Sequence, residues 1–165
     1  GFMTKASKFN NSNCHILVEH GKRDMMNESF RVFRTNLDMV IDKKPGEAYV
    51  TMFTSFNPNA GKTFVIQNIA ASMSLKGAKV LLVDLDLRKA TLSKAVDKDH
   101  MGVSAYLNGK VADYHENIDV ISDNLYLLPV GKLPPNPTEL LANQYFKEFL
   151  DAARNQYDYI FTSKT

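Results

Sequence analysis

The feature that most restricts the fold of this chain is a Gly-Lys-Thr triplet, residues 61–63, between a strand-like run and a helix-like run. The strand-like run is "AYVTMFTS" (48–55), and the helix-like run is "FVIQNIAASMSLKG" (64–77). A second strand-like run, "AKVLLVDLD" (78–86), follows and is almost purely apolar. Such runs are typical of strands that are covered on both faces of a parallel sheet. The order predicts a βαβ unit with a right-handed crossover, and therefore an α/β protein with a mostly parallel sheet.

The rest of the chain is expected to add further helices and strands. A helix should begin at Asp24, because apolar residues then recur at steps of three and four and give one apolar face. The members of that face are Met26, Phe30, Phe33, Leu37, Val40 and Ile41. Further elements are expected as a short helix at 102–109, strands at 117–121 and 124–131, a helix over "TELLAN" (138–143) that Pro137 helps to start, a helix at 144–156 and a strand that opens at 157–161.

Composition and charge exclude several classes of protein. At 165 residues, with 44% hydrophobic and 23% charged residues, the chain has the composition of an ordinary globular domain. Its net charge of +2 and the lack of a dense basic tract argue against nucleic acid as a partner. The longest apolar runs are too short to span a bilayer. The single Cys14 excludes an internal disulfide and fits a reducing compartment.

The Gly-Lys-Thr triplet has the chemistry of a phosphate-binding loop. A helix that starts after a strand leaves backbone N–H groups unpaired, and its dipole adds positive charge there. Gly61 permits close approach to a phosphate, Lys62 supplies a point charge, and Thr63 offers a hydroxyl to Mg²⁺. The usual first glycine of such a loop is replaced by Phe56, but turn-forming residues follow it, among them Asn59. A chance triplet at a helix start is the alternative.

Two carboxylates end the second strand, at Asp84 and Asp86. Ligands of parallel α/β sheets bind beyond the carboxyl ends of the strands, so these two residues can share a crevice with the phosphate loop. One carboxylate can orient Mg²⁺ or its waters, and the other can accept a proton from an attacking hydroxyl. Two surface aspartates at the start of a loop are the simpler interpretation, which the neighbouring phosphate loop disfavours.

Four stretches together resemble the cytoplasmic catalytic domain of the bacterial tyrosine kinases, the P-loop kinases of capsule and exopolysaccharide export. They are the phosphate loop "TSFNPNAGKT", the acidic motif "VLLVDLDLRKATL", the helix "ESFRVFRTNL" at 28–37 and the segment "GKLPPNPTELL" at 131–141. The resemblance runs from about residue 24 to 161. It implies a three-layer P-loop NTPase fold of the MinD and ParA superfamily, incomplete at its C-terminus. Residues 1–23 are expected to be a tag remnant, because Gly1-Phe2 precedes Met3, followed by a polar arm or linker. Residues 24–165 are then a shortened kinase domain.

The resemblance also implies an activity, cofactors and partners. The activity is that of an ATP-dependent protein tyrosine kinase that phosphorylates its own copies in trans, with ATP and Mg²⁺ as cofactors. The implied partners are further copies of the chain in a ring and a transmembrane polysaccharide co-polymerase or activator. The implied place is the cytoplasmic face of the cell membrane, and no role with nucleic acid is expected.

Residue roles follow from the same resemblance. The loop would hold ATP through Asn57, Asn59, Ala60, Gly61, Lys62, Thr63 and Phe64. Mg²⁺ would be held by Thr63, Asp86 and Asp84, while catalysis would rest on Asp84 as the base, Lys62 and Arg88. Oligomerisation would use Glu28, Arg31 and Arg34. Residues three apart are also neighbours on one helix surface, so Glu28 and Arg31 can instead pair within the helix.

The sequence departs from the family at its end. The family's third acidic strand ends in Asp, whereas "YDYIFTSKT" has Ser163 at that position, and no cluster of tyrosines is present. A shortened chain with foreign last residues, a fragment, and a degenerate relative all remain open explanations, and each predicts a handicapped kinase. Two alternatives to a kinase are therefore kept. One is a non-catalytic nucleotide-binding or scaffold protein of the polysaccharide machinery. The other is a MinD-like or ParA-like ATPase, which Asn57 disfavours because that group needs Lys there.

Overall fold

The computed structural model describes residues 16–54, 61–87, 90, 92–95, 102–110, 113–132 and 135–164. The strands are β1 (Tyr49–Thr54), β2 (Val80–Asp84), β3 (Asp119–Ser122), β4 (Leu125–Leu128) and β5 (Tyr159–Lys164). The α-helices are α1 (Met25–Val40), α2 (Lys62–Leu75), α3 (Val103–Leu107), α4 (Pro137–Leu141) and α5 (Gln144–Arg154). Two 3₁₀ turns, η2 (Leu92–Ala95) and η3 (Tyr114–Asn117), complete the described elements.

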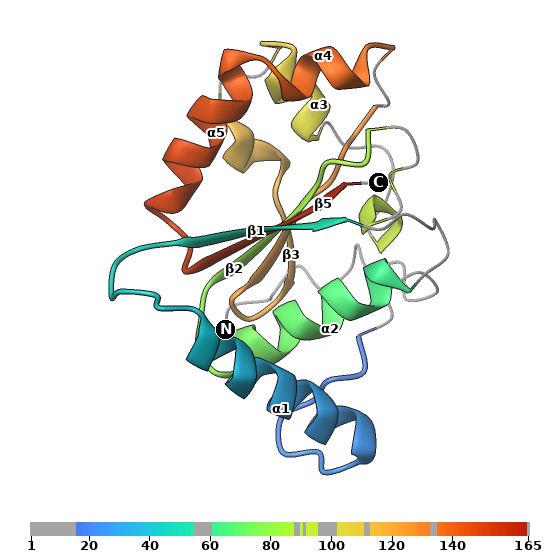
Figure 1. Ribbon diagram of the computed structural model, residues 1–165. Coiled ribbons are helices and arrows are strands. Elements are labelled where there is room, and N and C mark those ends of the chain that lie inside the picture. The colour runs from blue at the N-terminus through green and yellow to red at the C-terminus, as the bar shows by residue number, and fades with distance from the viewer. Residues whose placement is uncertain are drawn as a thin grey trace, which may run out of the picture.

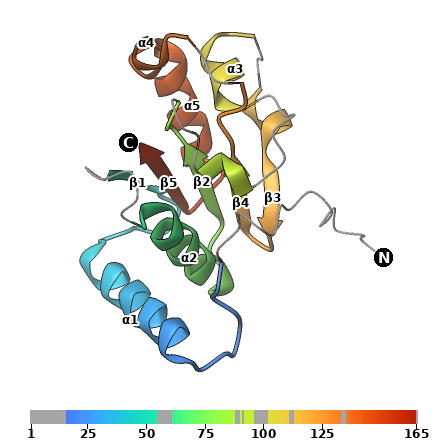
Figure 2. The ribbon, with the colours of Figure 1, turned by 90° about the vertical axis from the view of Figure 1, so that its right-hand side faces the viewer.

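The strands form one sheet in the order β1-β5-β2-β4-β3 (Figures 1 and 2). Only β3 runs antiparallel to its neighbour, so the predicted mostly parallel α/β sheet is confirmed. The last described strand, β5, lies between β1 and β2 and pairs with both. It therefore separates the two strands of the predicted βαβ unit and brings its own carboxyl end between theirs.

Helices cover both faces of the sheet and create two hydrophobic cores. On one face α2 packs against the strands and α1 packs on α2, while α3, α4 and α5 lie on the other face (Figure 1). Alternate residues of β2 enter different cores, with Leu82 on the α2 side and Leu81 on the α5 side. Every residue of β2 is buried, which explains its nearly pure apolar sequence.

The predicted apolar face of α1 is only partly right. The structure buries Phe30 and Ile41, but Met26, Phe33 and Val40 remain 41%, 45% and 83% exposed. These three residues are spaced by seven, so they form a separate stripe along the helix. Among the described elements α1 packs mainly on α2, which covers the other stripe and leaves this one exposed.

Hydrogen bonds hold the segment before α1 against α1 and α2. The backbone N–H groups of Leu17 and Val18 donate to Asn68 Oδ1 of α2 over 2.8 and 3.3 Å. Asp24 then caps α1 by accepting a hydrogen bond from Asn27 N over 2.8 Å. Residues 16–23 therefore lie against the α1–α2 pair.

Candidate functional site: the Gly-Lys-Thr helix start and two buried aspartates

The helix that follows the phosphate loop begins at Lys62, two residues earlier than the sequence pattern predicted. Gly61 precedes it with φ of 75° in the left-handed region, where residues with a Cβ are strained. A Cβ at Gly61 would meet no atom within 4 Å, so the backbone conformation, not crowding, requires glycine. Lys62 and Thr63 thus belong to the first turn of α2, whose N–H groups have no intrahelical partner.

Part of the predicted loop lies outside the described residues. Asn57, Asn59 and Ala60 fall in the segment 55–60, and Arg88 follows the last described residue of its own stretch. Their expected contacts with ATP therefore stay predictions. Phe64 is described and half-buried, with its ring centroid 6.0 Å from that of Phe30 in α1. Its side chain serves the α1–α2 contact, so only its backbone is free to face a phosphate.

Lys62 reaches across the carboxyl end of the sheet. Its Nζ donates a hydrogen bond to the backbone oxygen of Lys164 over 2.8 Å. Lys164 is the last residue of β5 and pairs with Thr54, the last residue of β1. The ammonium group of the phosphate loop therefore lies at the edge of the sheet where β1 and β5 end.

Asp84 ends β2 and is fully buried. Its Oδ1 accepts a hydrogen bond from Asp86 N over 2.9 Å, and its Oδ2 accepts from Ser93 N and Ser93 Oγ over 2.7 and 2.6 Å. Burial raises the pKa of Asp84 to about 6, although the bonds from Ser93 and Asp86 oppose that shift. A carboxyl group with that pKa can exchange a proton near neutral pH.

Asp86 lies two residues further on and is 6% exposed. Its backbone oxygen accepts a hydrogen bond from Ala90 N over 2.8 Å, which closes a turn after β2. The two carboxylates and the hydroxyl of Thr63 are hard oxygen donors, the kind that Mg²⁺ prefers. Both oxygens of Asp84 already accept hydrogen bonds, so Asp84 would have to exchange one of them to bind Mg²⁺ directly.

Ser163 occupies the position between the phosphate loop and Asp84. It is 3% exposed and pairs with Asp84 on one side and with Phe53 of β1 on the other. Asp84 and Ser163 are both an even number of residues from core residues on the α2 side, Leu82 and Phe161, so both face α2. Within the described ranges no three His, Cys, Asp or Glu side chains come together as a metal site. A carboxylate at 163 would lie on the strand neighbouring that of Asp84 and face the same side of the sheet.

The charged residues predicted for oligomerisation lie far from this edge of the sheet. Glu28 and Arg31 form an ion pair within α1, the alternative that their spacing left open. Arg34 donates to Ser72 O and Ser72 Oγ over 3.0 and 3.3 Å. Ser72 is ten residues after Lys62 on α2, which places the group about 15 Å away along the helix axis. Their intersubunit role stays a prediction.

Sequence reasoning missed Ser93. Its Oγ also accepts a hydrogen bond from Val130 N over 2.7 Å, so one hydroxyl links Asp84 to the end of the β4 region. Ser93 lies in η2, for which no periodic pattern was visible. A small hydroxyl residue in "ATLSKA" carries no signal of its own, and only the fold brings it to Asp84.

Comparison with known proteins agrees with this arrangement. The sequence profile of the AAA domain family matches residues 48–163. A "Putative tyrosine-protein kinase in cps region" from Klebsiella pneumoniae is 34% identical over 151 residues, 88% of this chain and 20% of that protein. "Tyrosine-protein kinase CpsD" of Streptococcus pneumoniae is 34% identical over 136 residues, 81% of this chain and 58% of that one. The chain therefore spans only part of the relatives that it matches.

Solved structures show the same likeness. The kinase domain of Escherichia coli tyrosine kinase ETK matches with a TM-score of 0.74 and 31% identity, over 83% of this chain and 53% of that one. The Pyrococcus furiosus cell division ATPase MinD matches less well, with a TM-score of 0.57 and 26% identity over 71% of this chain and 49% of that one. The chain belongs to the AAA domain family of P-loop proteins and, within it, to the bacterial tyrosine kinases of the capsule type.

Proposed function

We propose that this domain is the catalytic part of an ATP-dependent protein tyrosine kinase that phosphorylates copies of itself in trans and serves capsule or exopolysaccharide synthesis. One observation carries the proposal: β5 pairs in parallel with both β1 and β2, so the carboxyl ends of all three strands, and with them Lys62 and Asp84, lie at one edge of the sheet. A phosphate-binding helix start and buried carboxylates at one edge are the parts that phosphoryl transfer needs. The names of the relatives, which are tyrosine-protein kinases, support the same activity.

In this proposal the first turn of α2 holds the nucleotide. The N–H groups of Gly61, Lys62, Thr63 and Phe64 bind phosphate oxygens, and Asn57, Asn59 and Ala60 complete the loop. The ammonium of Lys62 leaves the carbonyl of Lys164 and moves onto the terminal phosphates. Magnesium, when bound, neutralises charge on those phosphates. Thr63 and Asp86 would hold it, and Asp84 would help to orient its water shell.

Asp84 is the base in this proposal. A pKa of about 6 leaves most of the carboxylate ionised at pH 7, while keeping it basic enough to accept the proton of a tyrosine hydroxyl. To do so Asp84 must exchange one of its present hydrogen bonds for that hydroxyl. Arg88, beyond the described stretch, is proposed to lie near the phosphates or a neighbouring subunit.

The acceptor tyrosines of this proposal lie mainly outside the described core. Tyr106, Tyr114, Tyr157 and Tyr159 are each at most 9% exposed, so a neighbouring active site cannot reach them. Tyr145 is 37% exposed and is the most accessible tyrosine in the described ranges. A tyrosine-rich segment of the same protein or of a partner is therefore the preferred substrate.

Assembly and membrane association are the remaining parts of the proposal. Glu28, Arg31 and Arg34 on α1 would join subunits into a ring at the inner face of the cell membrane, held there by a transmembrane activator. No helix among the described residues has the length and apolar character needed to cross a bilayer. The anchor in this proposal is consequently a partner or another segment of the protein.

A second candidate is a nucleotide-binding scaffold without kinase activity. Ser163 favours it, because the position beside Asp84 lacks the charge that would help to hold Mg²⁺. The two candidates separate on incubation with Mg-ATP followed by detection of phosphotyrosine, with the Lys62→Met variant as the control. Phosphotyrosine in the wild type alone supports the kinase. Nucleotide binding with equal signal from both proteins supports the scaffold.

A further inference from the structure

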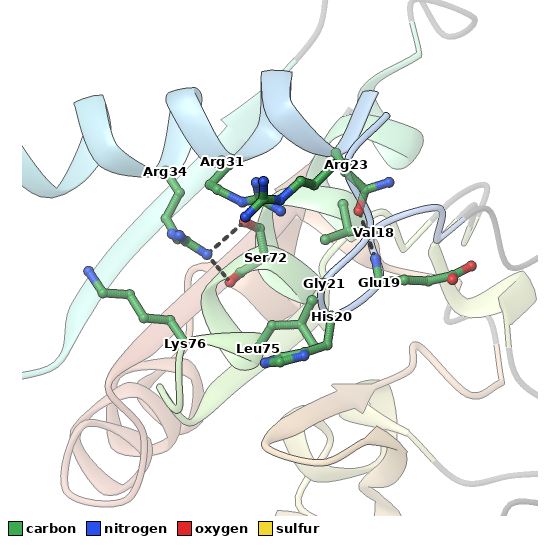
Figure 3. A pocket seen from close by; sticks show the side chains of 11 residues that line it. Val18, Glu19, His20, Gly21, Arg23, Arg31, Arg34, Ser72, Leu75 and Lys76 are labelled. Atoms are coloured by element: carbon green, nitrogen blue, oxygen red, sulfur yellow. Dashed lines mark hydrogen bonds between the residues drawn. The ribbon is translucent and has the colours of Figure 1, made fainter. Parts of the chain in front are cut away.

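A cavity of about 340 Å³ lies at the end of α2 opposite the phosphate loop (Figure 3). The segment 18–23 forms one wall, α1 forms another through Arg31 and Arg34, and the end of α2 forms the third. This cavity, which we call the arm cavity, is separated from Lys62 by the length of α2. None of the described residues of the phosphate loop or of the acidic motif lines it.

Buried amides hold the wall at 18–23 in place. Asn27 is 2% exposed, and it accepts a hydrogen bond from Glu19 N over 2.8 Å and donates one to Leu17 O over 3.2 Å. Asn68 is fully buried and accepts from Leu17 N over 2.8 Å. Two buried side chains therefore fix an otherwise irregular segment against α1 and α2, so the arm cavity is formed before any ligand arrives.

Positive charge dominates the lining. Four of the lining side chains are cations, and Glu19 is the one carboxylate among the lining residues. The four cations are Arg23, Arg31, Arg34 and Lys76. Figure 3 shows the guanidinium groups of Arg23, Arg31 and Arg34 directed toward the same space, with Lys76 at its rim.

Two of these cations lack a carboxylate partner within the described residues. Arg31 pairs with Glu28, and Lys76 pairs with Asp38 over 2.8 Å. Arg34 donates only to Ser72, and its buried Nε has no hydrogen-bond partner. An unpaired buried donor of a charged group costs free energy, which an anion in the cavity would recover.

From this arrangement we infer that the arm cavity binds a phosphate monoester carried on a small organic group. Guanidinium groups match phosphate oxygens as paired donors, and Arg23 and Arg34 are available to supply them. The cavity is larger than a bare phosphate needs, and Leu75 and Val18 give it an apolar side against which a ring can pack. The inference uses no residue of the nucleotide site, but it shares Arg31 and Arg34 with the proposed subunit contact, so it applies to the domain outside a ring.

Isothermal titration calorimetry with phenyl phosphate, which measures its affinity for the protein, tests the inference. The titration is done in the Lys62→Met protein, so that the phosphate loop does not contribute, and at a concentration where the protein is monomeric. Phenyl phosphate should bind, and Arg23→Gln should weaken binding about tenfold or more because a charge-assisted hydrogen bond is lost. Arg154→Gln, an exposed arginine of α5 outside the cavity, should bind as the parent does.

Three results would overturn the inference. They are the absence of phenyl phosphate binding, equal affinity in the Arg23→Gln and parent proteins, and inorganic phosphate binding as tightly as phenyl phosphate. The last would mean that the apolar side contributes nothing. Arg23 is outside both the nucleotide site and the Glu28–Arg34 stretch. Its substitution should leave kinase activity and assembly unchanged, so failure of this inference is distinguishable from failure of the proposed function.

Discussion

The hydroxyl of Ser93 lies 2.6 Å from Asp84 Oδ2, to which it donates, and 2.7 Å from Val130 N, from which it accepts. One small side chain therefore fixes the buried carboxylate at the end of β2 and joins it to the end of the neighbouring β4 region. Together with the bonds from Ser93 N and Asp86 N, it gives Asp84 a single orientation. The position of the proposed base depends on this residue.

Ser93→Ala should destabilise the domain and raise the pKa of Asp84 further. The variant removes one hydrogen bond that lowers this pKa and leaves the N–H of Val130 without its partner. We expect a loss of about 1–3 kcal/mol in urea unfolding at pH 7. Titration of the Asp84 carboxyl by carbon NMR measures the second effect. A pKa equal to that of the wild type would show that the hydroxyl does not hold the carboxylate.

Asp84→Asn should change the dependence of stability on pH. The pKa of Asp84 is about 6 in the folded chain against 3.8 for an unperturbed aspartate, so the folded state binds this proton more tightly than the unfolded state. The tighter binding of this proton stabilises the folded state fully below about pH 4, and that stabilisation is lost as the pH rises through about 6. Relative to the wild type, the variant should gain up to about 3 kcal/mol in unfolding free energy between pH 4 and 7. A pH-independent difference would contradict this assignment.

Ser163→Asp should create a stronger magnesium response. Ser163 is buried and pairs with Asp84, so a second carboxylate there places two like charges side by side. Without metal the variant should lose about 3 kcal/mol or more, because an uncompensated charge is buried. Millimolar Mg²⁺ should raise the melting temperature of the variant by more than it raises that of the wild type. Equal Mg²⁺ shifts in both proteins would place the metal elsewhere.

Replacing Arg31 and Arg34 together with Ala should lower the oligomer mass measured by light scattering. Their side chains would be lost from the proposed contact between subunits, while α1 retains its packing on α2 through Phe30. Arg154→Ala is the matched control for loss of a positive charge. An unchanged mass in the double variant, or a wild type that is already monomeric, would leave α1 without a role in assembly.

The sequence predicted the local parts of the site better than their arrangement. The glycine before α2 and the aspartates at the end of β2 could be placed from the sequence, because each has a local physical signature. These signatures are a left-handed backbone at Gly61 and the end of an apolar run at Asp84. The insertion of β5 between β1 and β2 could not be predicted from the sequence, because strand order depends on pairing between distant segments. That insertion is what makes Ser163 the neighbour of Asp84.

Contacts between side chains were also beyond the sequence. The stripe of α1 that is buried depends on the helix against which α1 packs, so Met26, Phe33 and Val40 of the predicted apolar face remain exposed. The arm cavity likewise arises only when the segment 18–23 folds back onto Asn68. A polar segment before a helix gives no indication that buried amides will hold it.

The most direct test of the kinase proposal is transfer of the γ-phosphate from Mg-ATP to a copolymer of Glu and Tyr. This acceptor does not depend on tyrosines of the chain itself. The wild type and Lys44→Met, an exposed lysine distant from α2 in sequence, should phosphorylate it at equal rates, whereas Lys62→Met should lose nearly all activity. Incorporation that is equal in all three proteins, or absent from a wild type that binds ATP, would contradict the account.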